Sequence, residues 1–240
     1  MSLSRRGFLS ATGAASLLAL TGCEGTQTGA GSATSEPRFT EDGRPIATIR
    51  AEPLSPLAEL YGIEPISYAE RMDGARVLPP TGMSIIPAEF HRQVVEYSSP
   101  HRPGTIVIDN RTRHLYLILS DTVALRYGIA VGREGRTWRG RGVIYRRAHW
   151  PTWTPTARMI REDPSLARFA GGMPGGGRNP LGARALYLQS GGVDRGYRIH
   201  GTYEWWLLGQ YVSSGCIRMV NQDVIDLYER VPNGTRVISI

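Results

Sequence analysis

Lysine is absent from this sequence of 240 residues, so all 28 of its basic side chains are arginines. With 21 acidic residues the net charge is +7, which favours an anionic partner such as nucleic acid, anionic lipid or cell-wall polymer. The arginines are scattered, without a basic stripe interleaved with aromatic residues, which argues against nucleic-acid binding. Cysteine is nearly absent as well. Cys23 and Cys216 are not expected to pair, because Cys23 ends a leader segment, and no Cys/His set has zinc spacing.

The first 22 residues have the composition of an export leader. Two arginines precede an apolar run, residues 11–20, which is short and rich in Ala, Gly and Ser. A charged start followed by such a run is typical of a secretory signal, and the run is too short for a durable transmembrane helix. Residues 4–9 resemble the twin-arginine export motif. We therefore expect residues 1–22 to be a cleaved signal peptide and the protein to be periplasmic, with an ordinary amphipathic helix as the alternative.

The leader ends in Leu20–Cys23, which resembles a bacterial lipobox. By that resemblance, cleavage precedes Cys23 and its thiol becomes lipidated, so that acyl chains anchor the protein to a membrane without spanning it. A plain cleaved leader that happens to end near Cys23 is the alternative. Residues 23–37 are rich in Gly, Ser and Thr, and such a tether lets the folded part move roughly 20 Å from its anchor.

Residues 38–100 form a proline-rich N-terminal extension in which we find no chemistry. Prolines interrupt every periodic stretch, and only short helical turns are expected, near Leu57–Tyr61 and Glu89–Glu96. We expect this extension to wrap the following domain or to contact a partner.

The pattern changes at about residue 101 and then continues to residue 240. Short β-branched and apolar runs alternate with turn residues, a spacing typical of antiparallel strands, and the lack of regular helices between them argues against a parallel βαβ sheet. A late helix is predicted to be capped by Asn221 and ended by Pro232–Gly234. The sequence thus predicts a mainly β domain at 101–240, a sandwich or barrel with one or two short helices. Strands are expected at residues 105–109, 114–119, 123–131, 185–188, 197–200 and 236–240.

The strongest chemical constellation joins His200 to Cys216. His200 ends a predicted strand, and a loop with two tryptophans leads from it to Ser213–Cys216 and on into the predicted helix. A thiol becomes a strong nucleophile when a neighbouring histidine takes its proton. The Gly201 carbonyl would hold the second ring nitrogen of His200, and Gly215 would allow a tight turn whose N–H groups form an oxyanion hole.

Several nearby residues admit a structural interpretation beside the chemical one. Arg218 would favour the thiolate or clamp a substrate carboxylate in a bidentate contact, or else form a structural ion pair. A cysteine beside a glycine turn is by default a small buried hydrophobic residue, but the adjoining His-Gly and Ser-Ser-Gly sequences favour a nucleophile. Carboxylates are not clustered for a metal ion. The remaining histidines of the polar stretches, His91, His101 and His114, are expected to be surface or strand residues.

These residues resemble the signature of the YkuD-type L,D-transpeptidase family, and the resemblance covers roughly residues 100–240. Many members carry His at the position of Ser214, so we expect Ser214 only to donate a hydrogen bond. The segment before Gly104 has no counterpart that we can place. The resembling stretches are Pro103–Ile106, Trp150–Pro155, Asn179–Gly182, His200–Thr202, Ser213–Met219 and Asn221–Val224.

The resemblance implies a cysteine acyltransferase acting on peptidoglycan, with Cys216 as nucleophile and His200 as general base and acid. Cys216 would attack the bond between diaminopimelate and the terminal D-Ala of a tetrapeptide stem, and a second stem or a protein lysine would resolve the thioester. No metal or organic cofactor is implied, and inhibition by carbapenems is expected. Partners would be stem peptides, a wall-attached protein as acceptor and, through Cys23, a membrane. Substrate contacts are expected from Arg218, Ser214, Ser213 and Trp205.

Other functions remain open. Water as acceptor would make the same site a carboxypeptidase or endopeptidase, which the sequence does not separate from a transpeptidase. The basic charge and the tether would also suit a non-catalytic, lipid-anchored module that binds the wall. A thiol redox protein is disfavoured, because the mature domain has no second cysteine to resolve a disulfide.

Overall fold

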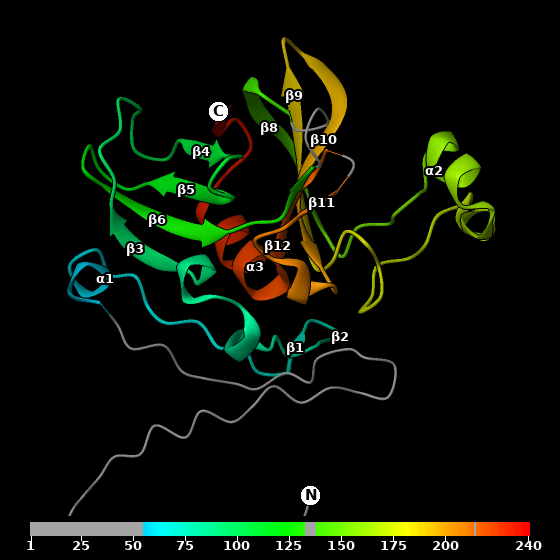
Figure 1. Cartoon of the computed structure of the whole chain (residues 1–240), viewed down its shortest axis with the longest axis horizontal. Coiled ribbons are helices and arrows are strands. Elements are labelled where there is room, and N and C mark those ends of the chain that lie inside the picture. Colours follow the sequence, from blue (N-terminus) through cyan, green and yellow to red (C-terminus); the bar gives the residue numbers. More distant parts are fainter. Residues whose placement is uncertain (1–54, 133–137, 214) are drawn as a thin grey trace, which may run out of the picture. The chain divides into compact units, whose positions relative to one another are not determined.

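The computed structural model describes residues 55–132, 138–213 and 215–240, and its backbone is mainly β, as the sequence predicts. The strands are Arg71–Asp73 (β1), Arg76–Leu78 (β2), Gln93–Glu96 (β3), Ile106–Asp109 (β4), His114–Ile118 (β5), Val123–Gly128 (β6), Val131–Gly132 (β7), Gly140–His149 (β8), Arg184–Ser190 (β9), Val193–Thr202 (β10), Tyr211–Ser213 (β11), Ile217–Val220 (β12) and Arg236–Ser239 (β13). Nine of them form one sheet in the order β12-β10-β9-β8-β13-β4-β5-β6-β3 (Figure 1).

The sheet is mixed. The predicted antiparallel meander is confirmed in β4, β5 and β6, which pair in sequence order. Two pairs are parallel, β10 with β12 and β4 with β13, and the sequence analysis did not anticipate them. Residues 203–216 supply the connection of a dozen or more residues that the parallel pair of β10 and β12 requires. Strand β8 was also missed, because its Gly- and Arg-rich sequence lacks the apolar alternation of a half-buried strand.

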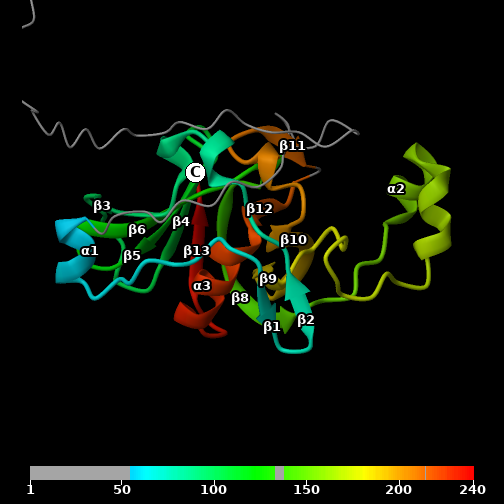
Figure 2. The same cartoon turned by 90° about the horizontal axis from the view of Figure 1, so that it is seen from below.

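The late helix, α3 (Asn221–Arg230), is confirmed and ends before Pro232–Gly234, as expected. The predicted cap is wrong: Val220 holds the N-cap position, and Asn221 is the first helical residue. The Oδ1 atom of Asn221 instead accepts a hydrogen bond from the backbone N–H of Ala183, at 2.9 Å. Most of the helix is buried against the sheet (Figure 2), and its apolar side chains join those of β9, β10 and β12 in the main core, to which β4, β5, β6, β8 and β13 also contribute.

Two short helices complete the regular structure, α1 (Pro56–Leu60) and α2 (Ala157–Glu162). The predicted turn near Leu57–Tyr61 is confirmed as α1, which Ser55 caps through a 3.2 Å hydrogen bond from the N–H of Ala58. The turn expected near Glu89–Glu96 is only partly present. Short 3-10 helices occur at Met83–Ile85 (η1), Ala88–Phe90 (η2), Pro164–Phe169 (η3) and Trp205–Leu207 (η4). Strand β3 follows η2 as an edge strand paired with β6.

The described part of the proline-rich extension is fastened to α3. The Tyr68 hydroxyl donates to Asp223 at 2.7 Å, and the Thr81 hydroxyl donates to Gln222 at 2.7 Å. Arg92 forms an ion pair with Asp226 at 2.8 Å. These three contacts, two of them buried, hold the first six residues of the helix. The extension therefore supports the element that follows the proposed nucleophile.

The predicted signal peptide, the lipidated Cys23 and the tether at 23–37 lie outside the described residues. So does the start of the extension, through residue 54. Among residues 55–132, 138–213 and 215–240, no helix has the length and apolar character needed to cross a membrane.

Candidate active site

Strand pairing brings His200 close to the segment that carries Cys216. In the parallel ladder of β10 and β12, His200 lies opposite Arg218. Cys216 directly precedes β12, and continuing the alternation of that strand by one residue would put its side chain on the face of His200. Gly215 has a φ of 130°, in keeping with the turn expected there. The thiol does not lead directly into the helix, as the sequence suggested, because β12 intervenes.

The ring of His200 is held in one tautomer. Its side chain is 4% exposed, and Nδ1 lies 2.7 Å from the carbonyl oxygen of Gly201. A carbonyl oxygen only accepts, so Nδ1 must carry the proton and donate. Burial lowers the pKa of His200 to about 3, the charge of Arg218 adds to this, and the Gly201 hydrogen bond opposes it. At neutral pH the ring is therefore uncharged, and Nε2 is left as a proton acceptor.

The thiol of Cys216 is also uncharged at rest. Burial raises its pKa above the usual value, although the positive charges of Arg198 and Arg218 lower it. The Sγ atom lies 3.7 Å from the carbonyl oxygen of Gly196, to which the thiol donates. The site is thus poised as a neutral thiol and a neutral imidazole. Deprotonation must accompany attack, as expected for a nucleophile with an adjacent general base.

A cavity of about 610 Å³ opens beside Cys216. Its walls come from β8, β9 and β10 and from the arm that carries α2 and η3, which projects from the sheet (Figures 1 and 2). A volume of this order suits a small peptide or drug-sized ligand. The residues that line it are Arg146, Thr152, Trp153, Thr154, Thr156, Arg158, Met159, Glu162, Leu181, Tyr187, Arg195, Gly196, Tyr197, Arg198, Gly215 and Cys216.

The base of this arm is fixed by Asn179, which is 1% exposed. Its amide Nδ2 donates to the carbonyl oxygens of Pro151 and Met173, each at 3.0 Å, and so ties the two legs of the arm together. The legs also pair through Trp153 and Met173, whose backbone hydrogen bonds are 2.9 and 2.7 Å long. Beyond this point α2 and η3 have no fully buried residue. The hydrogen bonds at the base of the arm therefore fix the position of the residues with which the arm lines the cavity.

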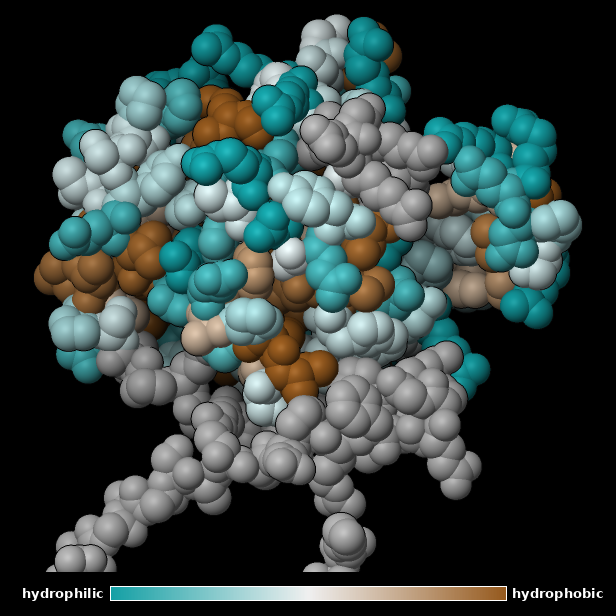
Figure 3. Space-filling view, in the orientation of Figure 1, coloured by the Kyte–Doolittle hydropathy of each residue, from teal (hydrophilic) through white to brown (hydrophobic). Residues whose placement is uncertain are grey.

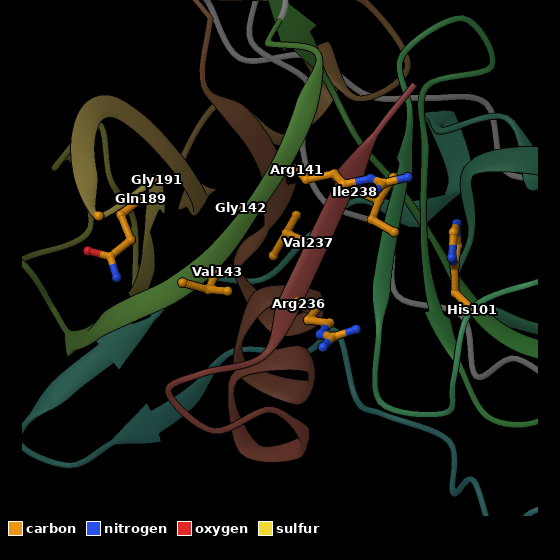
Figure 4. Close-up of a pocket in the computed structure, with 10 residues that line it drawn as sticks. His101, Arg141, Gly142, Val143, Gln189, Gly191, Arg236, Val237 and Ile238 are labelled. Carbon is orange, nitrogen blue, oxygen red and sulfur yellow. The ribbon is translucent and has the colours of Figure 1, made fainter.

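A second cavity, of about 480 Å³, lies where β8 and β13 meet the β9–β10 turn, and it shares no lining residue with the first. Figure 4 shows Arg141, Arg236 and His101 around it, from β8, from β13 and from the segment before β4. Its lining includes no cysteine, serine or carboxylate to act as a nucleophile. The first cavity, which contains Cys216, is therefore the candidate active site.

Arg198 is a site residue that the sequence analysis missed. Its guanidinium forms a bidentate ion pair with Asp194, with distances of 2.7 and 2.9 Å, and the Tyr145 hydroxyl donates to the same carboxylate at 2.6 Å. Burial opposes ionisation of Asp194, but these two partners and the Gly196 N–H hold its pKa down to about 2. Arg198 lies two residues before His200, so strand alternation alone would have placed it on the same face.

Two of the other predicted site residues, Arg218 and Trp205, do not line the cavity, although the sequence predicted that they contact substrate. Arg218 forms an ion pair with Glu204 at 2.9 Å, the alternative that the sequence left open. Trp205 is 8% exposed and packs in a core cluster with Tyr68 and Val220. Among the described residues that line the cavity, neither Arg218 nor Trp205 is present. Ser213 ends β11, and Ser214 lies outside the described residues.

Within the described ranges, no group of three or more His, Cys, Asp or Glu side chains could hold a metal ion.

The backbone next to the proposed base is tightly packed. A Cβ atom added at Gly201 would lie 2.2 Å from Asn221 Oδ1 and 3.1 Å from the Ala183 nitrogen. We expect Gly201→Ala to destabilise the fold by about 1–3 kcal/mol, the usual cost of overpacking. Chemical denaturation measures this cost. Gly176→Ala is the matched control, because its Cβ would meet no atom within 4 Å. Equal stability of the two variants would contradict the packing described.

Comparison with known proteins identifies the family. A model of the YkuD L,D-transpeptidase catalytic domain matches residues 103–238, more than half of the chain, so the chain belongs to the L,D-transpeptidase family. The resemblance seen in the sequence is thereby confirmed. Over 191 residues the chain is 31% identical to the probable L,D-transpeptidase YbiS of Escherichia coli K12, covering 78% of this chain and 59% of that protein.

A second relative supports the same assignment. The probable L,D-transpeptidase ErfK/SrfK of Escherichia coli K12 is 34% identical over 193 residues, which cover 78% of this chain and 58% of that protein. The chain thus spans about three fifths of the length of these relatives. A crystal structure of a probable carnitine operon oxidoreductase from Brucella melitensis is 48% identical and covers 65% of this chain and 96% of its own, with a TM-score of 0.45. The family assignment does not rest on that structure.

Proposed function

We propose that this chain is a peptidoglycan L,D-transpeptidase that works through a thioester on Cys216. One observation carries the proposal. A buried, uncharged His200 has Nδ1 committed to the Gly201 carbonyl and lies opposite Arg218, two residues from Cys216, which borders a large cavity. A histidine fixed in this tautomer presents an unprotonated Nε2, which can take a proton as a general base.

In the first half of the reaction, Nε2 of His200 accepts the thiol proton as Sγ of Cys216 attacks the donor carbonyl. That carbonyl joins the L-centre of diaminopimelate to the terminal D-Ala of a tetrapeptide stem. The S–C bond forms, and backbone N–H groups at Gly215 and Cys216 stabilise the oxyanion. When the tetrahedral intermediate collapses, the C–N bond breaks and the imidazolium returns its proton to the departing D-Ala amine.

The second half reverses these roles. The side-chain amine of a second stem, or of a protein lysine, attacks the thioester while His200 accepts its proton. The thiolate leaves and is reprotonated, and a 3–3 crosslink or a wall-attached protein results. Burial is the main cause of the low pKa of His200, and the charge of Arg218, which pairs with Glu204, lowers it further and so also favours a neutral resting base. In this proposal Arg218 tunes the base, and it is not the substrate clamp that the sequence suggested.

The location of the protein follows from the same proposal. Peptidoglycan stems lie outside the cytoplasm, so the enzyme needs export, which the leader at residues 1–22 would provide. Lipidation of Cys23 would hold the domain near its polymeric substrate on a short tether. The net positive charge would favour approach to an anionic wall.

The purified protein, incubated with disaccharide-tetrapeptide, is expected to release D-Ala and to form 3–3 crosslinked dimers. Mass spectrometry of the products measures both. Release of D-Ala with only tripeptide formed would show that water is the acceptor and would make the enzyme a carboxypeptidase. No release of D-Ala, from protein whose Cys216 still reacts with iodoacetamide, would overturn the proposed function.

A further inference from the structure

The cavity beside Cys216 is strongly cationic. Four arginines line it, Arg146, Arg158, Arg195 and Arg198, against a single carboxylate, Glu162. Arg158 pairs with Glu162 at 2.8 Å, and Arg198 is paired with Asp194. Two positive charges are left over. In the described part of the chain, neither Arg146 nor Arg195 forms an ion pair, and both are exposed residues of the cavity lining, so their charges lack a protein counter-charge.

Arg146 is positioned by a row of side chains that crosses three strands. In the registers of the sheet, Tyr187 of β9 lies opposite both Arg146 of β8 and Arg198 of β10. The two guanidinium carbons lie 4.4 and 4.5 Å from the centroid of the Tyr187 ring. Stacking on an aromatic ring holds the plane of a guanidinium group but leaves its N–H edge available for a carboxylate.

Arg195 lies in the part of the cavity lining that is near Cys216. It directly precedes Gly196, whose carbonyl oxygen is 3.7 Å from the sulfur of Cys216. β10 has a bulge between Asp194 and Arg198, where Gly196 has a φ of 87°. Bulges commonly redirect a side chain beside an active site, and this one lies where Arg195 borders the cavity. Since β8 and β10 are two strand spacings apart, roughly 10 Å, we assign the two arginines to different anionic groups.

We propose that this cavity selects a donor with at least two free carboxylates, and that Arg146 and Arg195 bind them. The proposal rests on the proposed function and names the substrate class of the same site. The donor is a peptide stem whose side-chain and terminal carboxyl groups are unmodified. Stems in which these groups are amidated keep their shape but lose the charge, and they are poor donors.

The charges on the arm that carries α2 are consistent with selection of a donor by its carboxylates. On the face shown in Figure 3 its surface is mainly hydrophilic, with small apolar areas. Arg158 and Glu162 of α2 line the cavity as an exposed i,i+4 pair that contributes no net charge. The uncompensated charge therefore lies on the sheet side of the cavity, with Cys216. Arg158→Gln is accordingly expected to change donor preference less than Arg146→Gln does.

The test compares two donors, a stem peptide with free carboxylates and the same peptide with those groups amidated. For the wild-type protein we expect kcat/KM to be about tenfold to a hundredfold higher with the free acid, the range of charge-assisted hydrogen bonds. Arg146→Gln and Arg195→Gln are expected to lose most of this preference by raising KM for the free acid, with little change for the amide. Arg161→Gln, on α2 but outside the cavity lining, is the matched control and should retain the preference.

Failure of this proposal is distinguishable from failure of the proposed function. Calorimetric binding of both peptides to the Cys216→Ala protein measures recognition without turnover. Tighter binding of the free acid, lost in the Arg146→Gln and Arg195→Gln backgrounds, would support the subsite even if the wild type released no D-Ala. Equal affinity for the two peptides, or a preference that survives both substitutions, would overturn it.

Discussion

Cys216→Ala is expected to form no covalent adduct with a carbapenem and to release no D-Ala from stem peptides. Removing the nucleophile of a covalent mechanism costs kcat a factor of order 10⁶, which leaves only background. The wild-type protein should gain one carbapenem mass, because Cys216 borders an open cavity and His200 lies opposite Arg218 on the neighbouring strand. Intact-mass spectrometry after incubation reads out both proteins directly.

The first control for this experiment is a measurement showing that the Cys216→Ala protein is folded. Cys216 is half-buried, and alanine removes only the sulfur, so thermal unfolding of the variant should stay close to that of the wild type. Arg161→Gln serves as a second control that should be acylated normally. An adduct on folded Cys216→Ala protein would place the nucleophile elsewhere. An unmodified wild-type protein would favour a module that binds the wall without catalysis.

His200→Gln is expected to lower kcat by about 10²–10⁴, the usual contribution of a general base. Glutamine still offers an N–H to the Gly201 carbonyl, so the loss reports on proton transfer more than on folding. The pH profile gives the sharper signature. The pKa of His200 is held to about 3, so the wild-type base should remain neutral across pH 5–8. Its acylation rate should be nearly flat there.

In the glutamine variant the thiol must ionise without a local base. Burial raises the pKa of Cys216, so the rate should climb with pH throughout this window, and the gap to the wild type should shrink. Rates of carbapenem acylation between pH 5 and 9 measure this. Parallel profiles for the two proteins would show that His200 is not the base.

The same substitution has a predicted effect on stability. In the unfolded chain His200 has an ordinary pKa of about 6.5, and in the folded protein its pKa is about 3. Below pH 6.5 the unfolded state therefore binds more protons, and the fold loses stability as pH falls toward 3. His200→Gln removes that loss. Its melting temperature should fall less steeply on acidification than that of the wild type, while acid effects from carboxylates such as Asp226 remain in both.

Local patterns in the sequence were enough for much of the architecture. The β-branched run of β4 and the apolar run of β5 each carry their own strand signal, and the turn residues between them make the hairpin a local event. α3 was found in the same way, from helical spacing and the stop at Pro232–Gly234. The His200–Cys216 pair was also recognised without tertiary information, because both residues lie in short sequence motifs.

The sequence by itself determined the family, the mainly β fold and the pair of residues on which the chemistry is proposed to rest. Only the tertiary structure decided their protonation, since the tautomer and pKa of His200 depend on burial and on the Gly201 carbonyl. It also decided which arginines face the cavity. Arg218 forms an ion pair with Glu204. Arg146 lies on β8, which lacks apolar alternation and forms a strand through its pairing with β9 and β13. Charge compensation and strand pairing join residues far apart in the chain, and no local pattern specifies which partners will meet.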